Sequence, residues 1–261
     1  MPTPRKPAVA GLFYPADAGE LRAMIGRYLA EARPGEGAPK AIIVPHAGYV
    51  YSGPIAAAAY ARVASARGRV RRVVLLGPAH RVRFSGLAVS SADAFRTPLG
   101  EVPIDAAAVA SIMPLPQVSV LDEAHAEEHS LEVQLPFLQE ILGDFSLVPL
   151  AVGDAGAAEV GEVIEKLWGG DETLIVISSD LSHYLDYESA RLRDEATSRA
   201  IEALGYEDIS YDDACGRDPV NGLLFVARKR GMQAERLDLR NSGDTAGTPD
   251  RVVGYGAYAF A

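Results

Sequence analysis

The sequence contains a single cysteine, Cys215, so no disulfide can form within the chain. No segment approaches the run of about 18 apolar residues that a membrane-spanning helix needs, and the opening residues lack the apolar stretch of a signal peptide. Basic residues are also few: 25 lysines and arginines face 35 acidic residues, and the resulting net charge of -10 repels nucleic-acid phosphates. These absences predict a cytoplasmic protein that neither spans a membrane nor binds nucleic acid.

The 261 residues, 48% hydrophobic and 23% charged, have the composition of an ordinary globular protein. Short runs rich in β-branched residues alternate with longer segments of helical spacing, which is typical of an α/β fold. The turn at residues 97–100 lies between two extended runs and favours antiparallel pairing there, hence a mixed sheet. No linker or repeat divides the chain. We therefore expect one domain over residues 1–261, with a mixed central sheet flanked by helices.

The pattern also predicts the individual elements. The expected strands are Lys40–Pro45, Arg72–Leu76, Leu87–Ser90, Ser146–Val152, Thr173–Ser178, Glu235–Leu239 and Val252–Phe260. The expected helices are Ala18–Ala32, Pro54–Ala66, Asp105–Met113, Ser130–Leu142, Ala155–Trp168, Tyr187–Leu204 and Asn221–Arg230.

Three of the expected strands each lead directly into a histidine. AIIVPH ends at His46, VVLLGPAH at His80 and IVISSDLSH at His183. Sheets of α/β proteins bind ligands beyond the carboxyl ends of their strands, where successive loops converge on one crevice. We therefore expect these imidazoles, which are distant in the sequence, to meet at one edge of the sheet.

His46 and His80 are the first two metal ligands that we expect, and Asp244, which follows another strand, is the expected third. Two imidazoles and a carboxylate on one face of an ion form the arrangement of non-haem Fe(II) sites, which leaves positions open for O₂ or substrate. Each residue alone also has an ordinary role, as a loop histidine, a cap and an Asx-turn residue respectively. Their shared placement at strand ends favours the metal site.

Asp180 and His183 are three residues apart, so one helical turn after the strand would place both on the same side. A carboxylate bonded to an imidazole fixes its tautomer and raises its basicity, which suits a catalytic proton-transfer pair. Asp180 is equally suited to cap the helix that would follow.

A second histidine pair, His125 and His129, has the spacing of a helical metal site. The similarity is weak because the glutamate stands one position late for a His-Glu-x-x-His motif. We expect Glu128 and His129 at the entry to a helix that Ser130 can cap. His129 is the third candidate catalytic residue, and Glu128 is a candidate substrate contact.

The segment between Gly48 and Gly53 is predicted to be a loop, with Pro54 at the first position of the next helix. Its free amides could bind an anion, although no lysine follows to make it a P-loop. We expect Tyr49, Tyr51 and Ser52 to line the substrate pocket, the two rings being suited to an aromatic ligand. Core packing is the alternative for at least one of the tyrosines.

Cys215 is a candidate nucleophile because Arg217 could stabilise its thiolate, but a buried structural thiol is the commoner case. The spacing of the two residues is not that of a tyrosine phosphatase. No Gly-x-Ser-x-Gly elbow or Gly-x-Gly-x-x-Gly fingerprint occurs, which argues against a serine hydrolase or a Rossmann dehydrogenase.

Eight ordered motifs spanning nearly the whole chain resemble the Memo family. They are AGLFYPAD, VPHAGYVYSG, LLGPAH, TPLGEVPID, EEHSLEVQLPFLQ, ISSDLSHY, CGRDP and RNSGD. The resemblance implies a fold similar to that of class III extradiol ring-cleavage dioxygenases, with His46 and His80 matching metal-binding histidines. Asp180 and His183 match polar residues of the same cleft.

The resemblance also bears on the metal and the partners. Vertebrate members supply a cysteine near the position of Asp244, where this chain has none. A carboxylate ligand there would favour Fe(II), with copper or zinc as alternatives. Prokaryotic members of this type, called AmmeMemoRadiSam system protein B, often accompany an AMMECR1-type protein and a radical-SAM protein.

Two functions follow as hypotheses. The first is a non-haem metal protein, an oxidoreductase or dioxygenase, that carries out an O₂-dependent oxidation or related redox step on a small molecule, aromatic for example. The second is a non-catalytic module that uses the cleft to bind a peptide of the phosphotyrosine type or a partner protein.

Overall fold

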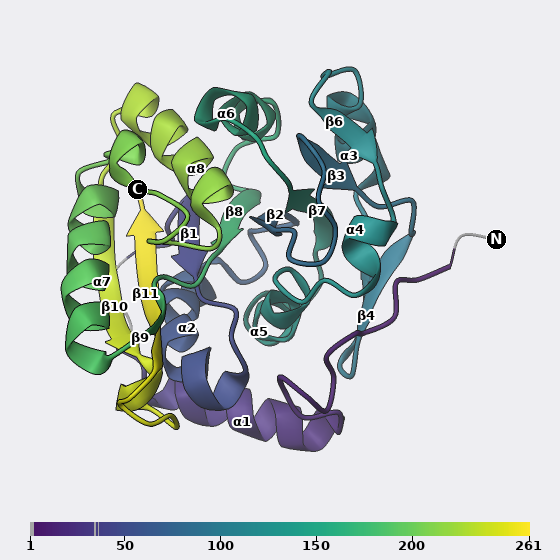
Figure 1. Cartoon of the computed structure of the whole chain (residues 1–261). Coiled ribbons are helices and arrows are strands. Elements are labelled where there is room, and N and C mark those ends of the chain that lie inside the picture. The colour runs from purple at the N-terminus through teal and green to yellow at the C-terminus, as the bar shows by residue number, and fades with distance from the viewer. Residues whose placement is uncertain (1–2, 34, 36) are drawn as a thin grey trace.

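Figure 1 shows a computed structural model of the chain, which describes residues 3–33, 35 and 37–261. Its strands are β1 (Ala41–Val44), β2 (Arg72–Pro78), β3 (Leu87–Val89), β4 (Ala94–Thr97), β5 (Gly100–Pro103), β6 (Val118–Val120), β7 (Ser146–Val152), β8 (Thr173–Ser178), β9 (His183–Leu185), β10 (Ala234–Asn241) and β11 (Val252–Phe260). Its α-helices are α1 (Ala18–Glu31), α2 (Tyr49–Val63), α3 (Ala106–Ile112), α4 (Glu123–Ala126), α5 (Leu135–Leu142), α6 (Ala157–Lys166), α7 (Tyr187–Glu202) and α8 (Arg217–Arg230). Short 3₁₀ turns are η1 (Ala64–Ala66), η2 (Glu132–Gln134), η3 (Tyr206–Asp208) and η4 (Ser242–Asp244).

The central sheet is mixed, as the sequence predicted. Within the described residues it has nine strands in the order β10-β11-β1-β8-β2-β7-β3-β6, with β9 attached to β11. The central strands β1, β8, β2 and β7 run parallel, whereas β11 pairs antiparallel with β1 and β3 pairs antiparallel with β7. The turn at residues 97–100 joins β4 to β5 in a separate antiparallel hairpin. The α/β class is therefore confirmed.

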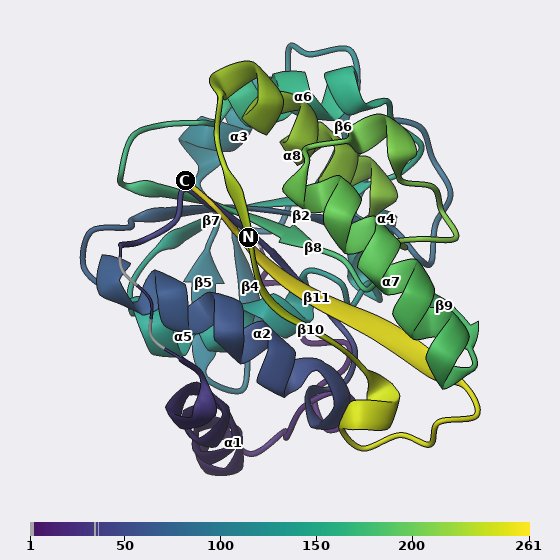
Figure 2. The same cartoon turned by 90° about the vertical axis from the view of Figure 1, so that its left-hand side faces the viewer.

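Helices cover both faces of the sheet, which explains why its central strands are apolar on successive residues. Ile42 and Val44 of β1 pack on the side of α1, α2 and α5. Ala41 and Ile43, the alternate residues, pack on the side of α3, α6 and α8. Figure 2 shows these two layers below and above the sheet. In the described part of the chain, no helix is both long and apolar enough to cross a bilayer.

Three predicted helix starts were wrong. Helix α8 begins at Arg217, not Asn221, and the other two starts lie near the carboxyl ends of β1 and β2. Helix α2 begins at Tyr49, not Pro54, so the expected anion-binding loop forms the first turns of the helix, with Gly48 as its N-cap. The helix expected from Ser130 starts as the η2 turn at Glu132 and becomes α-helical at Leu135. Ser130 is not a cap, because its hydroxyl donates to the carbonyl oxygen of Pro78 at 2.8 Å.

Candidate metal centre

The three central parallel strands β1, β8 and β2 are adjacent, so the residues that follow them are brought together. His46 follows β1, Asp180 follows β8 and His80 follows β2. The ring centroids of His46 and His80 lie 5.2 Å apart. Imidazoles separated by more than thirty positions in the sequence therefore share one edge of the sheet.

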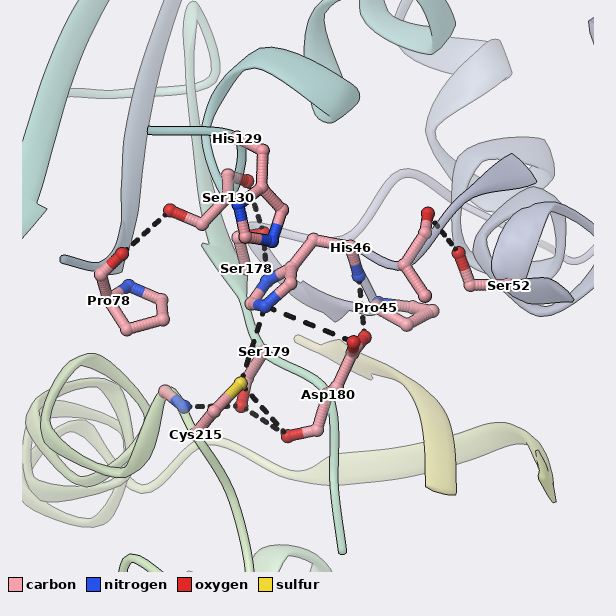
Figure 3. Close-up of polar contacts among 12 residues, drawn as sticks. Pro45, His46, Ser52, Pro78, His129, Ser130, Ser178, Ser179, Asp180 and Cys215 are labelled. Atoms are coloured by element: carbon pink, nitrogen blue, oxygen red, sulfur yellow. Dashed lines mark hydrogen bonds and ion pairs between the residues drawn. The ribbon is translucent and has the colours of Figure 1, made fainter. Parts of the chain in front are cut away.

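His129 joins this pair from the loop between α4 and η2. Its ring centroid lies 5.4 Å from that of His46 and 4.8 Å from that of His80. The neighbouring Ser130 fixes the loop to the end of β2 through its bond to Pro78, as Figure 3 shows. The three imidazole rings are therefore neighbours of one another.

Hydrogen bonds determine which ring nitrogen of His46 carries the proton and which has an available lone pair. The Ser178 hydroxyl donates its only proton to the carbonyl oxygen of Ser130 at 2.6 Å, and its oxygen accepts from Gln134 at 2.7 Å. The same oxygen lies 3.0 Å from Nδ1 of His46 and can only accept from it. Nδ1 therefore carries the proton, and the lone pair of Nε2 points toward Cys215 and Asp180 (Figure 3).

His80 is held in the same tautomer by Glu128. One carboxylate oxygen of Glu128 lies 2.9 Å from Nδ1 of His80, and the other accepts the His80 backbone N–H at 2.6 Å. Burial alone would raise the pKa of Glu128, but the hydrogen bonds and charge of His80, with the Ser130 N–H, lower it to about 2. An ionised carboxylate on Nδ1 leaves Nε2 free, as in carboxylate–histidine–metal sites.

Cys215 completes a group of metal-binding donors with the two histidines. Donor atoms of His46, His80 and Cys215 all lie within 4.8 Å of one another, and Sγ is 3.3 Å from Nε2 of His46. In a tetrahedral site with metal–nitrogen bonds of about 2.0 Å and metal–sulfur bonds of about 2.3 Å, ligand nitrogen and sulfur are about 3.5 Å apart. The donor set therefore fits a transition-metal ion.

The protonation states of these groups suit a cation. Burial lowers the pKa of His46 well below its ordinary value and that of His129 to about 4, so both rings are neutral at neutral pH. Burial raises the pKa of Asp180 to about 6 and also raises that of the Cys215 thiol. Neutral imidazoles are the form that binds metals, whereas the thiol would lose its proton only on binding one.

Comparison with known proteins identifies the family of this chain. The family model of Memo-like proteins matches residues 5–259. A MEMO1 family protein of Aquifex aeolicus is 38% identical over 262 residues, which cover 96% of this chain and 97% of that protein. A MEMO1 family protein of Methanopyrus kandleri is 38% identical over 283 residues, covering 98% of each. The chain belongs to the Memo family. The crystal structure of an uncharacterized Escherichia coli K12 protein matches 82% of this Memo family chain and 98% of its own, with a TM-score of 0.48 and 15% identity.

In this Memo family protein, Asp244 does not join the histidines. Its two carboxylate oxygens accept from the Tyr187 hydroxyl at 2.7 Å and from the Asn241 backbone N–H at 2.9 Å, within the η4 turn. Among the described residues, no group of clustered metal-binding side chains includes Asp244. Asp244 is therefore the capping-box partner of Asn241, and Asn241 itself makes the Asx turn by accepting from the Gly243 N–H at 2.9 Å. The Cys215 thiol lies beside His46 and His80, where the Asp244 carboxylate was expected.

Asp180 and His183 do not form the expected pair, because β8 is followed by a loop and the short strand β9 where a helix was expected. His183 bonds through Nδ1 to the carbonyl oxygen of Leu181 at 2.8 Å. Asp180 turns to His46, accepting its backbone N–H at 2.7 Å, with its second oxygen 4.0 Å from Nε2. Both residues still line the same cleft.

The cleft beside these groups has a volume of about 1080 Å³. Its base is formed by the histidines, Asp180 and Cys215, and Tyr51 lies in its wall. The two neighbours of Tyr51 in the predicted pocket do not reach it: Tyr49 is buried with its hydroxyl bonded to Val133 at 2.6 Å, and the Ser52 hydroxyl bonds to Ala47 at 2.8 Å. Core packing therefore holds for Tyr49.

His125, the first histidine of the pair His125 and His129, lies outside the cleft. Its burial predicts that the stability of the fold depends on pH. His125 is buried, and its Nε2 lies 2.9 Å from the carbonyl oxygen of Ala88. Burial lowers the pKa of His125 to about 4. The charge of Arg5 acts in the same direction, whereas the bond to Ala88 and the carboxylates of Asp122 and Glu128 oppose the shift.

Because His125 has a pKa near 6.5 in the unfolded chain, unfolding binds a proton at any pH between about 4 and 6.5. Its contribution to stability is complete above pH 6.5 and is lost as the pH falls toward 4. When the pH is lowered from 7.5 to 4.5, we expect the free energy of unfolding of His125→Gln to fall by about 2 to 3 kcal/mol less than that of the wild type. Urea unfolding at both pH values measures this, and equal losses in the two proteins would contradict it.

Proposed function

We propose that this Memo family protein is a redox metalloprotein in which His46, His80 and Cys215 hold one ion. A single observation carries the proposal: two imidazoles have their Nε2 lone pairs set free by Ser178 and Glu128 beside a thiol. Orienting bonds of this kind are what metal ligands in proteins require. A purely structural role would not need both rings in the same tautomer.

The donor set bears on which metal is bound. The expectation of Fe(II) relied on the Asp244 carboxylate, and a thiol in its place widens the choice to copper, since sulfur is a softer ligand. Zinc would also bind but has no redox chemistry of its own. We retain Fe(II) as the proposed ion for an O₂-dependent step, with copper as the alternative.

When bound, the ion would supply an open coordination position and electron transfer. The residues of the chain would manage protons and orientation. Glu128 keeps the His80 ring in place, and Ser178 does the same for His46. His129, neutral at neutral pH and beside both rings, can accept a proton from substrate. Asp180, with its pKa raised by burial to about 6, can release or take one.

Anaerobic loading of the protein with Fe(II), Cu(I) or Zn(II), followed by O₂-uptake measurements with a panel of catechols, tests this function. We expect O₂ consumption with a redox-active ion and none with zinc. His129→Gln, which retains ligands His46 and His80, should bind the metal but slow uptake. Saturable metal binding without O₂ uptake for any catechol would contradict the oxidation.

That outcome would favour the second function, a binding module. Side chains at the rim of the cleft support it, since Leu12 is 80% exposed, Tyr184 62% and Tyr211 55%. Exposed apolar groups gathered around one cleft are typical of a surface that binds a peptide or protein.

A further inference from the structure

The cleft is lined by three arginines although the chain as a whole carries a charge of -10. The side chain of Arg81 has no hydrogen-bond or ion-pair partner within residues 3–33, 35 and 37–261. The Arg251 guanidinium lies 4.7 Å from the centre of the Tyr184 ring. Arg193 donates to the Asp212 carbonyl at 3.2 Å and lies 3.8 Å from a carboxylate oxygen of Asp213. Two of the three guanidinium groups therefore retain their capacity to bind an anion.

Negative charge in the cleft does not balance these arginines. Asp180 and Asp212 are the carboxylates among the described lining residues. Asp180 lies at the base, where it accepts the backbone N–H of His46. Guanidinium groups match carboxylate and phosphate oxygens with paired N–H donors, so an excess of them in a cleft favours an oxyanion.

Aromatic rings line the same cleft, and one of them is held at a conformational cost. Phe13, Tyr51, Tyr184 and Tyr255 all border it. Tyr184 has φ of 61°, one of two non-glycine residues with positive φ in the described chain. This conformation costs a bulky residue of order 1–3 kcal/mol and is most common at functional sites. The strained backbone presents the Tyr184 ring, with Arg251 stacked on it, directly beside His183.

We propose that the cleft binds a small aromatic molecule carrying an oxyanion group, either carboxylate or phosphate. Arg81 and Arg251, the two arginines without a carboxylate partner, supply the guanidinium groups for the oxyanion, with Arg251 supported by Tyr184. The aromatic ring lies toward the histidines. Any reaction of the aromatic ring at the metal centre rests on the proposed function. Binding of the oxyanion itself needs only the residues of the chain.

Calorimetric titration of metal-free protein with 4-hydroxybenzoate, phenyl phosphate and the neutral 4-hydroxybenzamide tests this. We expect at least one anion to bind about tenfold or more tightly than the amide, equivalent to about 1.4 kcal/mol, and to weaken as salt rises. The tighter of the two anions identifies the oxyanion. Equal binding of all three probes, or no binding of any at millimolar concentration, would overturn the proposal.

Variants test whether the arginines cause the preference for the anion over the amide. Arg81→Ala/Arg251→Ala should retain the affinity for the amide, which shows an intact cleft, while the preference for the anion falls to about twofold or less. Arg96→Ala is the matched control, because Arg96 pairs with Glu101 on the β4–β5 hairpin outside the cleft. An unchanged preference in the double variant would contradict the assignment. Because the protein is metal-free, failure here leaves the metal centre untouched, and failure of metal binding leaves this result untouched.

Discussion

Replacing His46 and His80 together by alanine is expected to lower the affinity for Fe(II) by at least on the order of 10³-fold. Both donor nitrogens of the centre are lost, and the Cys215 thiol that remains lies in a buried site where its pKa is raised. A thiol that keeps its proton is a poor ligand.

Anaerobic Fe(II) titration of the wild type and the double variant measures this loss. His183→Ala is the matched control, because His183 lines the cleft but is not part of a cluster of metal-binding side chains in the described residues. Those clusters are His46, His80 and Cys215, and His80, Glu128 and His129. We expect the affinity of His183→Ala to stay within about tenfold of wild type. Unchanged Fe(II) affinity in the double variant would contradict a metal centre formed by His46 and His80.

The second large effect is expected from Arg5→Met, which should destabilise the fold by about 3–5 kcal/mol. Arg5 forms a buried ion pair with Glu132, whose side chain is fully buried. Glu132 also accepts from the backbone of Ala8 at 2.7 Å and from the Tyr14 hydroxyl at 2.5 Å. Removing the guanidinium leaves a carboxylate without a countercharge in the core.

Urea unfolding at pH 7 measures the loss. Arg5→Met/Glu132→Gln should recover part of it, because the uncompensated charge is gone. Arg22→Ala is the control, since Arg22 pairs with Glu140 at the surface and its loss should cost about 1 kcal/mol or less. Equal stabilities of Arg5→Met and Arg22→Ala would show that the buried pair does not hold the N-terminal segment.

The strands were predictable because burial on both faces makes them apolar on successive residues. β7, β8 and β11 begin and end where the sequence indicates. The proximity of His46 and His80 was predictable for a related reason. Each directly follows a buried strand, and parallel neighbours end at the same edge.

What the sequence could not indicate are contacts made by loops. Cys215 precedes α8 and Glu128 lies in a loop, and nothing in their local patterns indicates that both approach the ends of β1 and β2. The expected helix after Asp180 was wrong because Leu181 donates its backbone N–H to Gly254 of β11, and Ser182 accepts the Gly254 N–H. These bonds pair the following residues with β11 as β9. Long-range pairing overrode local spacing there.

Absorption spectroscopy of the Co(II)-substituted protein tests most directly whether His46, His80 and Cys215 share one ion. We expect saturation at one equivalent in the wild type, with a thiolate-to-cobalt charge-transfer band that is absent from Cys215→Ser. An identical charge-transfer band in Cys215→Ser, or a wild type that never saturates, would contradict the centre described above.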